Sequence, residues 1–229
     1  TVECVLVLIL VYALKTPLAA NPLTFFKFNR PFVVNVLKTS LPAALNEVLW
    51  SLGFTSYNAV YARIGTDAIA AVNINATIEE LMFVLFLGLG NACAVMIGNN
   101  IGAGDKHIAF EYGRRFLILG IATALIGGVV VFSLRETVVG LYDISLSAAN
   151  NLRGLMFVFA ISAWLKMINF ILFIGALRAG GDTKYGMFTE LFSIWMIGVP
   201  CALIGGFVLH LPVYGVYALV LLEEAAKAV

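Results

Sequence analysis

The chain has 229 residues, of which 62% are hydrophobic and 12% are charged, and its formal net charge is +1. Soluble domains carry about 25% charged residues, so this composition indicates an integral membrane protein. The small net charge argues against a general nucleic-acid-binding surface. Three scattered cysteines, Cys4, Cys93 and Cys201, show neither the spacing of metal ligands nor a disulfide framework.

Hydropathy predicts six long helices after a short apolar segment at residues 1–14, which is expected to be the tail of a further helix. The chain starts without Met and stops inside an apolar run, and we therefore expect a fragment cut at both ends. Prolines and glycine-containing turns separate the helices. The expected helices cover residues 32–61, 68–100, 107–133, 147–176, 184–208 and 212–229.

The charges of the connections predict an orientation in the membrane. Eight Lys and Arg residues lie in or beside alternate connections, against three in the others, and cytoplasmic loops carry this excess in membrane proteins. In two of these turns, glycines are expected to end one helix in a left-handed conformation and an Asp to cap the next. The turns predicted to be cytoplasmic contain Gly102, Gly104 and Asp105, and then Arg178, Gly181 and Asp182. The turns at Gly65, Asp143 and Pro212 are expected outside.

Glu47 lies near the middle of the expected helix 32–61. An ionisable residue at membrane depth is costly and indicates function by default. Pro42 lacks a backbone donor and is expected to kink or loosen the helix before Glu47. A polar stripe on such a helix should face protein or a water-filled cavity. At helical spacing the stripe contains Ser40, Glu47, Ser51, Thr55 and Asn58. Two interpretations stay open: a structural carboxylate, or a coupling or substrate site.

Further polar side chains recur at membrane depth. In the expected helix 68–100, one stripe holds Asn73, Thr77, Glu80 and Asn91. Glu79 lies one position off this stripe, four residues after Asn75. In the helix 147–176, Ser162, Lys166 and Asn169 share a stripe. Glu190 lies about two turns into the fifth expected helix, and Glu223 and Glu224 about three turns into the sixth.

Features of two other classes of membrane protein occur in the sequence. Gly102-Ala103-Gly104-Asp105 matches the GxGD pattern of intramembrane aspartyl proteases, whose chemistry needs two carboxylates that share a proton. The predicted topology instead places Asp105 and Asp143 on opposite sides of the membrane. His107 and His210 likewise lie at opposite helix ends, which argues against a shared metal or a catalytic triad. A channel stays open, although scattered carboxylates on kinked helices fit a gated cavity better than a ring-lined pore.

Three runs together resemble the MATE transporters, the multidrug and toxic compound extrusion family. LKTSLPAALNEVLWSLGF at 37–54 is similar to the family's seventh helix, and FLGLGNACAVMIGNNIGAGDKHIA at 86–109 to its eighth-to-ninth helix junction. IGALRAGGDTKYGMF at 174–188 is similar to the tenth-to-eleventh junction. The resemblance implies an all-α integral membrane fold, the C-terminal six-helix bundle of a twelve-helix transporter. It assigns residues 1–14 to the end of helix six, 15–31 to a cytoplasmic inter-lobe loop and 32–229 to the C-terminal lobe.

The resemblance also implies a function. The family exports organic, often cationic, compounds by alternating access, driven by a proton or sodium gradient. The implied protein is a multi-pass plasma-membrane antiporter and not an enzyme, with no cofactor beyond the coupling ion. Its partners would be a small-molecule substrate, the lipid bilayer and an N-terminal lobe, but no nucleic acid. The alternatives are a lipid-linked oligosaccharide flippase of the same superfamily and a channel-like protein without coupling.

The family's helix-seven carboxylate matches Glu47, whereas the Asp of helix ten corresponds to Met167, next to Lys166. A base in this place favours protons over sodium, and a sodium ion near Glu47 stays an alternative. Lys166 is expected to bond to Glu47 or to the Glu79/Glu80 pair, with Glu47 the first choice and Glu80 the second. The expected cavity residues are Glu47, Lys166, Asn169, Glu80, Glu79, Ser51, Asn73 and Trp50, with Glu190, Glu223 and Glu224 as secondary candidates.

Overall fold

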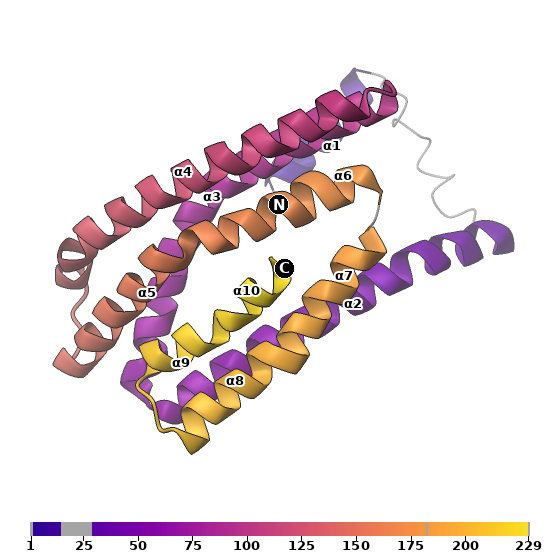
Figure 1. The fold of residues 1–229 in the computed structure, drawn as a ribbon. Coiled ribbons are helices and arrows are strands. Elements are labelled where there is room, and N and C mark those ends of the chain that lie inside the picture. The colour runs from indigo at the N-terminus through magenta and orange to yellow at the C-terminus, as the bar shows by residue number, and fades with distance from the viewer. Residues whose placement is uncertain (1, 15–28, 182, 229) are drawn as a thin grey trace. The chain divides into compact units, whose positions relative to one another are not determined.

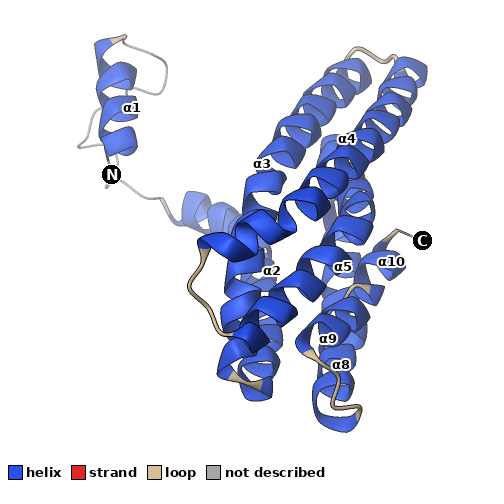
Figure 2. Ribbon diagram, turned by 90° about the vertical axis from the view of Figure 1, so that its left-hand side faces the viewer, coloured by secondary structure: helices blue, strands red, loops and turns tan. Residues whose placement is uncertain are grey.

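The structure is a computed structural model that describes residues 2–14, 29–181 and 183–228, and every regular element in these ranges is a helix (Figures 1 and 2). The all-α fold class expected from hydropathy is therefore confirmed. The chain divides into two compact units, Thr1–Glu47 and Val48–Val229. Each unit is described by itself.

The first unit contains α1 (Val2–Ala13) and the start of α2 (Arg30–Ile64). Most described side chains here are exposed and apolar, among them Leu10 and Leu41. Pro31 falls in the first turn of α2, where its missing N–H removes no helical hydrogen bond. The helix then continues without interruption through Pro42, so the loosening expected there does not break it. The predicted loop at 15–31 lies mostly outside the described residues.

The second unit begins within α2 and is built on three long antiparallel helices, α3, α4 and α5, which contact one another along their lengths (Figure 2). Their bounds are α3 Thr66–Gly102, α4 Lys106–Leu141 and α5 Leu146–Phe170. The remaining elements are η2 Ile171–Leu177, α6 Arg178–Gly180, α7 Thr183–Ser193, η3 Ile194–Gly198, α8 Val199–Leu203, η4 Ile204–Val208, α9 Val213–Val220 and α10 Leu222–Lys227. The three η elements are π-helical segments: η2 and η3 each join two α-helices, and η4 continues α8 to its end at Val208.

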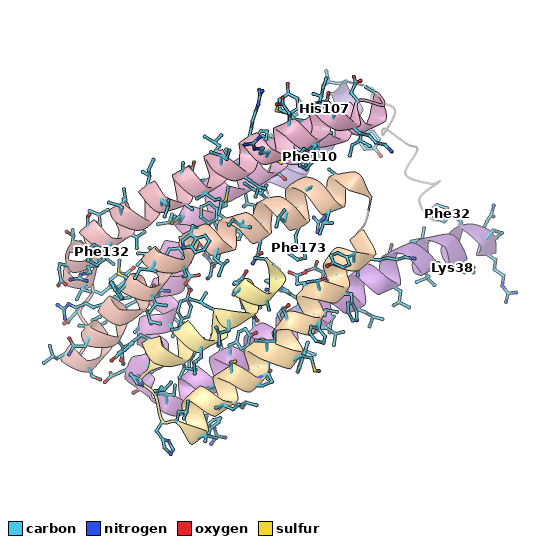
Figure 3. All side chains as sticks on the ribbon, in the orientation of Figure 1. Phe32, Lys38, His107, Phe110, Phe132 and Phe173 are labelled. Atoms are coloured by element: carbon cyan, nitrogen blue, oxygen red, sulfur yellow. The ribbon has the colours of Figure 1, made fainter. Side chains whose placement is uncertain are left out.

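Small residues on α4 allow close approach of the neighbouring helices. Gly120, Ala124 and Gly128 are buried and recur every four residues, so they lie on one face. A Cβ at Gly120 would meet Met167 of α5, and one at Gly128 would meet the backbone of Ala160. This packing, expected from the sequence, is the kind that holds membrane helices together. The outer side chains of α4, such as Phe110 and Phe132, are exposed (Figure 3).

Four described helices are long and apolar enough to cross a membrane: Thr66–Gly102, Lys106–Leu141, Leu146–Gly180 and Lys184–Val208. They correspond to four of the six expected spans. α2 is long enough to cross a membrane, but it is not among these four helices. The short helices α9 and α10 are not among them either. The chain is thus a multi-pass membrane protein by the length and composition of its described helices.

Two expected helix ends were wrong. The helix expected to end at 133 continues to Leu141, and in this last part Glu136 forms ion pairs with Arg153 of α5 at 3.0 Å and with Arg135 at 3.4 Å. Hydropathy falls at these charges, but the backbone stays helical. The helix expected over 212–229 is interrupted at Leu221, so that α9 and α10 are separate pieces.

The turns agree with the glycine prediction and only in part with the capping prediction. Gly104 and Gly181 have φ of 89° and 87°, a left-handed conformation that glycine adopts at no steric cost. Asp105 stands at the N-cap of α4, but its side chain makes no capping hydrogen bond. Asp182 lies outside the described residues. Within the second unit, the Gly104 and Gly181 turns lie at one end and the connections before α3, α5 and α9 at the other (Figure 1).

This arrangement makes topology directly testable. We expect single cysteines at Lys106 and Asp143, introduced into a full-length protein without its native cysteines, to react with membrane-impermeant reagents from opposite sides, Lys106 from the cytoplasm. A cysteine at Ser145 is the matched control, because Ser145 caps α5 and belongs to the same turn as Asp143. Labelling of Lys106 and Asp143 from one side would contradict the orientation predicted from the loop charges.

Candidate functional site

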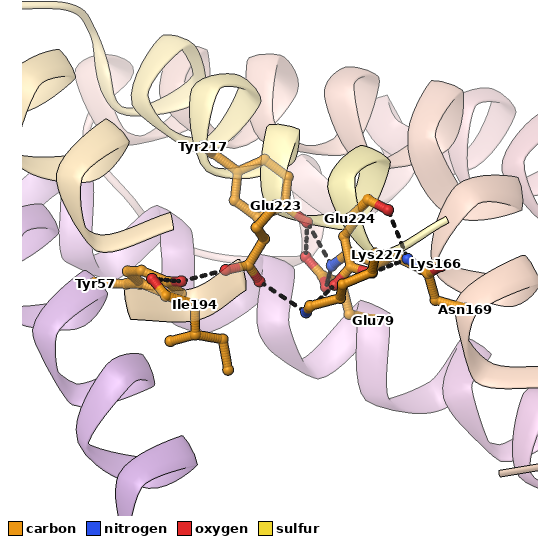
Figure 4. Close-up of polar contacts among 9 residues, drawn as sticks. All are labelled: Tyr57, Glu79, Lys166, Asn169, Ile194, Tyr217, Glu223, Glu224 and Lys227. Atoms are coloured by element: carbon orange, nitrogen blue, oxygen red, sulfur yellow. Dashed lines mark hydrogen bonds and ion pairs between the residues drawn. The ribbon is translucent and has the colours of Figure 1, made fainter. Parts of the chain in front are cut away.

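The first of two polar clusters surrounds Lys166 in the second unit; we call Asn75, Glu79, Lys166 and Tyr217 the Lys166 cluster. Figure 4 draws Glu79, Lys166 and Tyr217 of this cluster. Lys166 Nζ lies 2.6 Å from Glu79 Oε2 and 2.9 Å from Tyr217 Oη. Tyr217 Oη and Asn75 Nδ2 each donate to Glu79 Oε1 at 2.6 Å. The Lys166 and Glu79 side chains are 18% and 20% exposed. Glu79 therefore has three donors, one of them cationic, which suits an ionised carboxylate.

Helical periodicity explains which α3 residues enter this cluster. Asn75 and Glu79 are four residues apart, on the side of α3 that also buries Met82 and Phe86. Glu80 points about 100° away from Glu79 and is exposed. The expected stripe of Asn73, Thr77, Glu80 and Asn91 is exposed throughout. Glu80, the second expected partner of Lys166, is therefore wrong. The carboxylate bonded to Lys166 is its neighbour Glu79.

The second cluster surrounds Lys227; we call Tyr57, Asn169, Glu223, Glu224 and Lys227 the Lys227 cluster (Figure 4). Lys227 Nζ lies 3.3 Å from Glu223 Oε1 and 3.3 Å from Glu224 Oε1. Tyr57 Oη donates to Glu223 Oε2, and Asn169 Nδ2 donates to Glu224 Oε2 at 2.6 Å. Glu223 is only 3% exposed. In this cluster one ammonium group forms ion pairs with two carboxylates.

A glycine makes room for the Tyr57–Glu223 hydrogen bond. Gly198 ends the π-helical segment η3, and a Cβ at this position would collide with both Tyr57 Oη and Glu223 Oε2. Tyr57 Oη also lies 3.5 Å from the carbonyl oxygen of Ile194, the first residue of η3. π-helical turns occur frequently at functional sites. In this chain η3 brings a glycine and a backbone carbonyl to the buried end of the Lys227 cluster.

Each cluster contains one buried amide oxygen that has no hydrogen-bond partner among the described residues. These are Asn75 Oδ1 in the Lys166 cluster and Asn169 Oδ1 in the Lys227 cluster. Asn75 is 2% exposed and Asn169 5%. Both side chains already donate to a cluster carboxylate. A buried acceptor without a donor is costly, so each of these oxygens is a place where a water molecule or other donor would be stabilised.

The remaining expected site residues belong to neither cluster. Glu47 belongs to the first unit, is exposed, and forms no hydrogen bond or ion pair with a described residue. Ser51 and Trp50 are exposed, and the Trp50 ring contacts Phe54 at 4.4 Å between centroids. Glu190 on α7 interacts electrostatically with Lys227. Met167, the position at which the resemblance placed the family's helix-ten Asp, is fully buried.

Sequence reasoning missed four members of the two clusters: Tyr57, Asn75, Tyr217 and Lys227. The tyrosines resemble ordinary apolar positions of membrane helices in the sequence. Lys227 carried a usable signal, because it follows Glu223 by four residues and Glu224 by three, the spacing of helical ion pairs. Such a pair next to an apolar run would have marked the cluster.

The described residues also bear on the rejected chemistries. Asp105 precedes α4 and Asp143 follows it, and a 36-residue helix is about 54 Å long, so the two carboxylates cannot share a proton. Within the described ranges no three His, Cys, Asp or Glu side chains are grouped as a metal site would require. The protease interpretation therefore fails on distance.

Comparison with known proteins decides the family. The MatE family model matches residues 42–204, which is more than half of the chain. The chain belongs to the MATE family. Members of this family are transporters and not enzymes, as the resemblance implied. The matched region includes Glu47, three members of the Lys166 cluster (Asn75, Glu79 and Lys166) and both turn motifs that were predicted to be cytoplasmic.

Curated relatives of this MATE chain are multidrug resistance proteins. It is 29% identical over 178 residues to multidrug resistance protein NorM of Burkholderia vietnamiensis, covering 74% of the chain and 38% of the relative. It is 25% identical over 167 residues to a probable multidrug resistance protein NorM of Xanthomonas axonopodis pv. citri, covering 72% and 36%. The chain thus spans somewhat over a third of these relatives' length.

Solved MATE structures share the fold. A crystal structure of MATE in the straight conformation matches with a TM-score of 0.79 and 15% identity, over 99% of this chain and 51% of that one. A transporter of the MOP superfamily from Pyrococcus furiosus, described as having a binding pocket of reversed polarity, matches with a TM-score of 0.78 and 17% identity, over 99% and 51%. At these identities the likeness concerns the fold.

Proposed function

We propose that the chain is the C-terminal lobe of a secondary active exporter, which moves organic compounds out of the cell by alternating access in exchange for protons. Membership of the MATE family supports the class of protein. The names of its relatives, multidrug resistance proteins, support organic compounds as the substrates. The partner in this proposal is an N-terminal lobe of the same protein, and the location is the plasma membrane.

The observation that carries the proposal is the pair of charged clusters inside the helical bundle. Ionisable side chains within membrane helices are costly, and they mark substrate paths, ion paths and proton relays. The clusters join α3, α5, α9 and α10, and the helix bearing Glu223 and Glu224 is interrupted just before them, at Leu221. Interrupted helices near the membrane midplane are characteristic of transporter binding sites.

The choice of protons over sodium follows from the lysines. In both clusters an ammonium group lies beside the carboxylates, at 2.6 Å in one and 3.3 Å in the other. A sodium ion at either place would face this positive charge, whereas a proton binds to a carboxylate oxygen without displacing the lysine. Glu47, exposed and free of bonds to described residues, is the proposed carboxylate at which proton and substrate compete.

The test is transport by the full-length protein in liposomes. We expect ethidium to move against its concentration gradient when a proton gradient is imposed, and to stop when an ionophore collapses that gradient. A sodium gradient alone should drive little movement. Ethidium flux that follows only its own concentration gradient would contradict coupled export and indicate a channel-like protein.

A further inference from the structure

The two clusters differ in how their charges balance. In the Lys166 cluster one ammonium meets one carboxylate, and their 2.6 Å contact is as short as a strong charge-assisted hydrogen bond. In the Lys227 cluster one ammonium meets two carboxylates, both at 3.3 Å. These longer contacts show that Lys227 is shared and holds neither carboxylate tightly. If both were ionised, the Lys227 cluster would keep one uncompensated negative charge.

Among the described residues, Lys227 is the only cation that acts on Glu223. From α2 it is faced by two phenols, Tyr57 and Tyr61. From its own helix it is faced by Glu224 and Lys227. α7 contributes a further carboxylate, Glu190, beside Lys227. From α5, Asn169 donates to Glu224. Lys166, which is bonded to Glu79, also attracts Glu224 electrostatically, but it does not act on Glu223.

Two carboxyl groups that share a buried site retain one proton between them, because two like charges at close range are unfavourable in low-dielectric surroundings. We propose that Glu223 and Glu224 form a proton-binding site around Lys227, in which one proton is shared and resides on Glu223. The carboxylate of Glu223 binds a proton from water to become the neutral acid, and releases it as the reverse step. Lys227 stays an ammonium group and pairs with Glu224 in the protonated state.

Three features favour Glu223 over Glu224 as the residue that carries the shared proton. Its side chain is 4% exposed, against 17% for Glu224, so its ionised form is the less hydrated of the two. Tyr57 suits both protonation states: it donates to the carboxylate, and it can accept from the acid while turning its own O–H toward the Ile194 carbonyl 3.5 Å away. Asn169, the partner of Glu224, donates through Nδ2 and so suits an ionised Glu224.

This inference deepens the proposed function, because it gives the coupling proton a second place in the lobe besides Glu47. Proton exchange at Glu223 would switch Lys227 between two carboxylates and one. The ion pairs of Lys227 lie within α10, but Glu223 accepts a hydrogen bond from Tyr57 of α2 and Glu224 one from Asn169 of α5, so the switch acts on the packing of α10 against these two helices. Such a change can bias one lobe conformation over another.

Infrared difference spectroscopy on the purified full-length protein tests the site directly, because a protonated carboxyl and a carboxylate absorb separately. We expect a carboxylic-acid band that disappears as the pH is raised and that is absent in Glu223→Gln. In Glu224→Gln, where Lys227 pairs with Glu223 alone, the band should disappear at a lower pH than in the wild type. Glu136→Gln is the matched control: Glu136 is one carboxylate between two arginines and should contribute no acid band. Tyr57→Phe, which keeps the ring, should move the pH at which the band disappears.

A band unchanged in Glu223→Gln, or lost in Glu224→Gln alone, would overturn the assignment to Glu223, and absence of any acid band in the wild type would overturn the site itself. These outcomes are independent of transport. An acid band on Glu223 without gradient-driven ethidium movement would overturn the proposed function and leave the proton site standing. Gradient-driven ethidium movement without an acid band would overturn the proton site and leave the proposed function standing.

Discussion

Replacing Lys166 with Met is expected to destabilise the protein by about 3–5 kcal/mol, the usual cost of removing one partner of a buried ion pair. The reason is that Glu79 would keep its charge in a place where only Tyr217 and Asn75 remain to stabilise it. Thermal and denaturant unfolding of the full-length protein in detergent would measure the loss. Transport by Lys166→Met should fall with it.

A double-mutant cycle shows whether this cost comes from the Glu79 pair. Lys166→Met combined with Glu79→Gln should recover most of the lost stability, because no uncompensated charge is left behind. Lys166→Met combined with Glu80→Gln is the matched control and should recover none, since Glu80 is the exposed neighbour of Glu79. Equal recovery with both partners, or additive losses with Glu79, would argue against the pair.

The fold class could be predicted from the sequence because it depends on local properties. Apolar length, prolines and glycines placed the long helices and the turns at Gly104 and Gly181, whose φ values need glycine. The interruption at Leu221 could not be predicted in this way. The run from Leu219 to Leu222 contains neither proline nor glycine, and the break instead accompanies two adjacent glutamates that both face Lys227.

Only those features of the candidate site that depend on the periodicity of a single helix could be predicted from the sequence. Periodicity indicated that Lys166 and Asn169 share a face, and both are cluster members. It could not choose between Glu79 and Glu80, which differ by one position, because the choice depends on where α5 and α9 lie relative to α3. Tyr57 and Gly198 are separated by more than a hundred residues, and only the folded bundle brings them to the same carboxylate.

Glu47→Gln is expected to reduce gradient-driven ethidium movement to the level of protein-free liposomes while leaving folding intact. Gln keeps the size and hydrogen-bonding shape of Glu but cannot bind and release a proton. Glu47 is exposed and bonds to no described residue, so its loss removes no structural interaction seen here. Unfolding temperature and membrane insertion should therefore match the wild type, in contrast to Lys166→Met.

The same variant separates the two carboxylates proposed to carry protons. Glu47→Gln should keep the acid band of Glu223, because Glu223 is held by Tyr57 and Lys227 and not by Glu47. Glu80→Gln is the control for an exposed carboxylate, and we expect it to transport ethidium. A well-folded Glu47→Gln protein with wild-type transport would remove Glu47 from the mechanism. Coupling would then have to rest on the carboxylates around Lys227, where Glu223→Gln should abolish it, or on residues outside this chain.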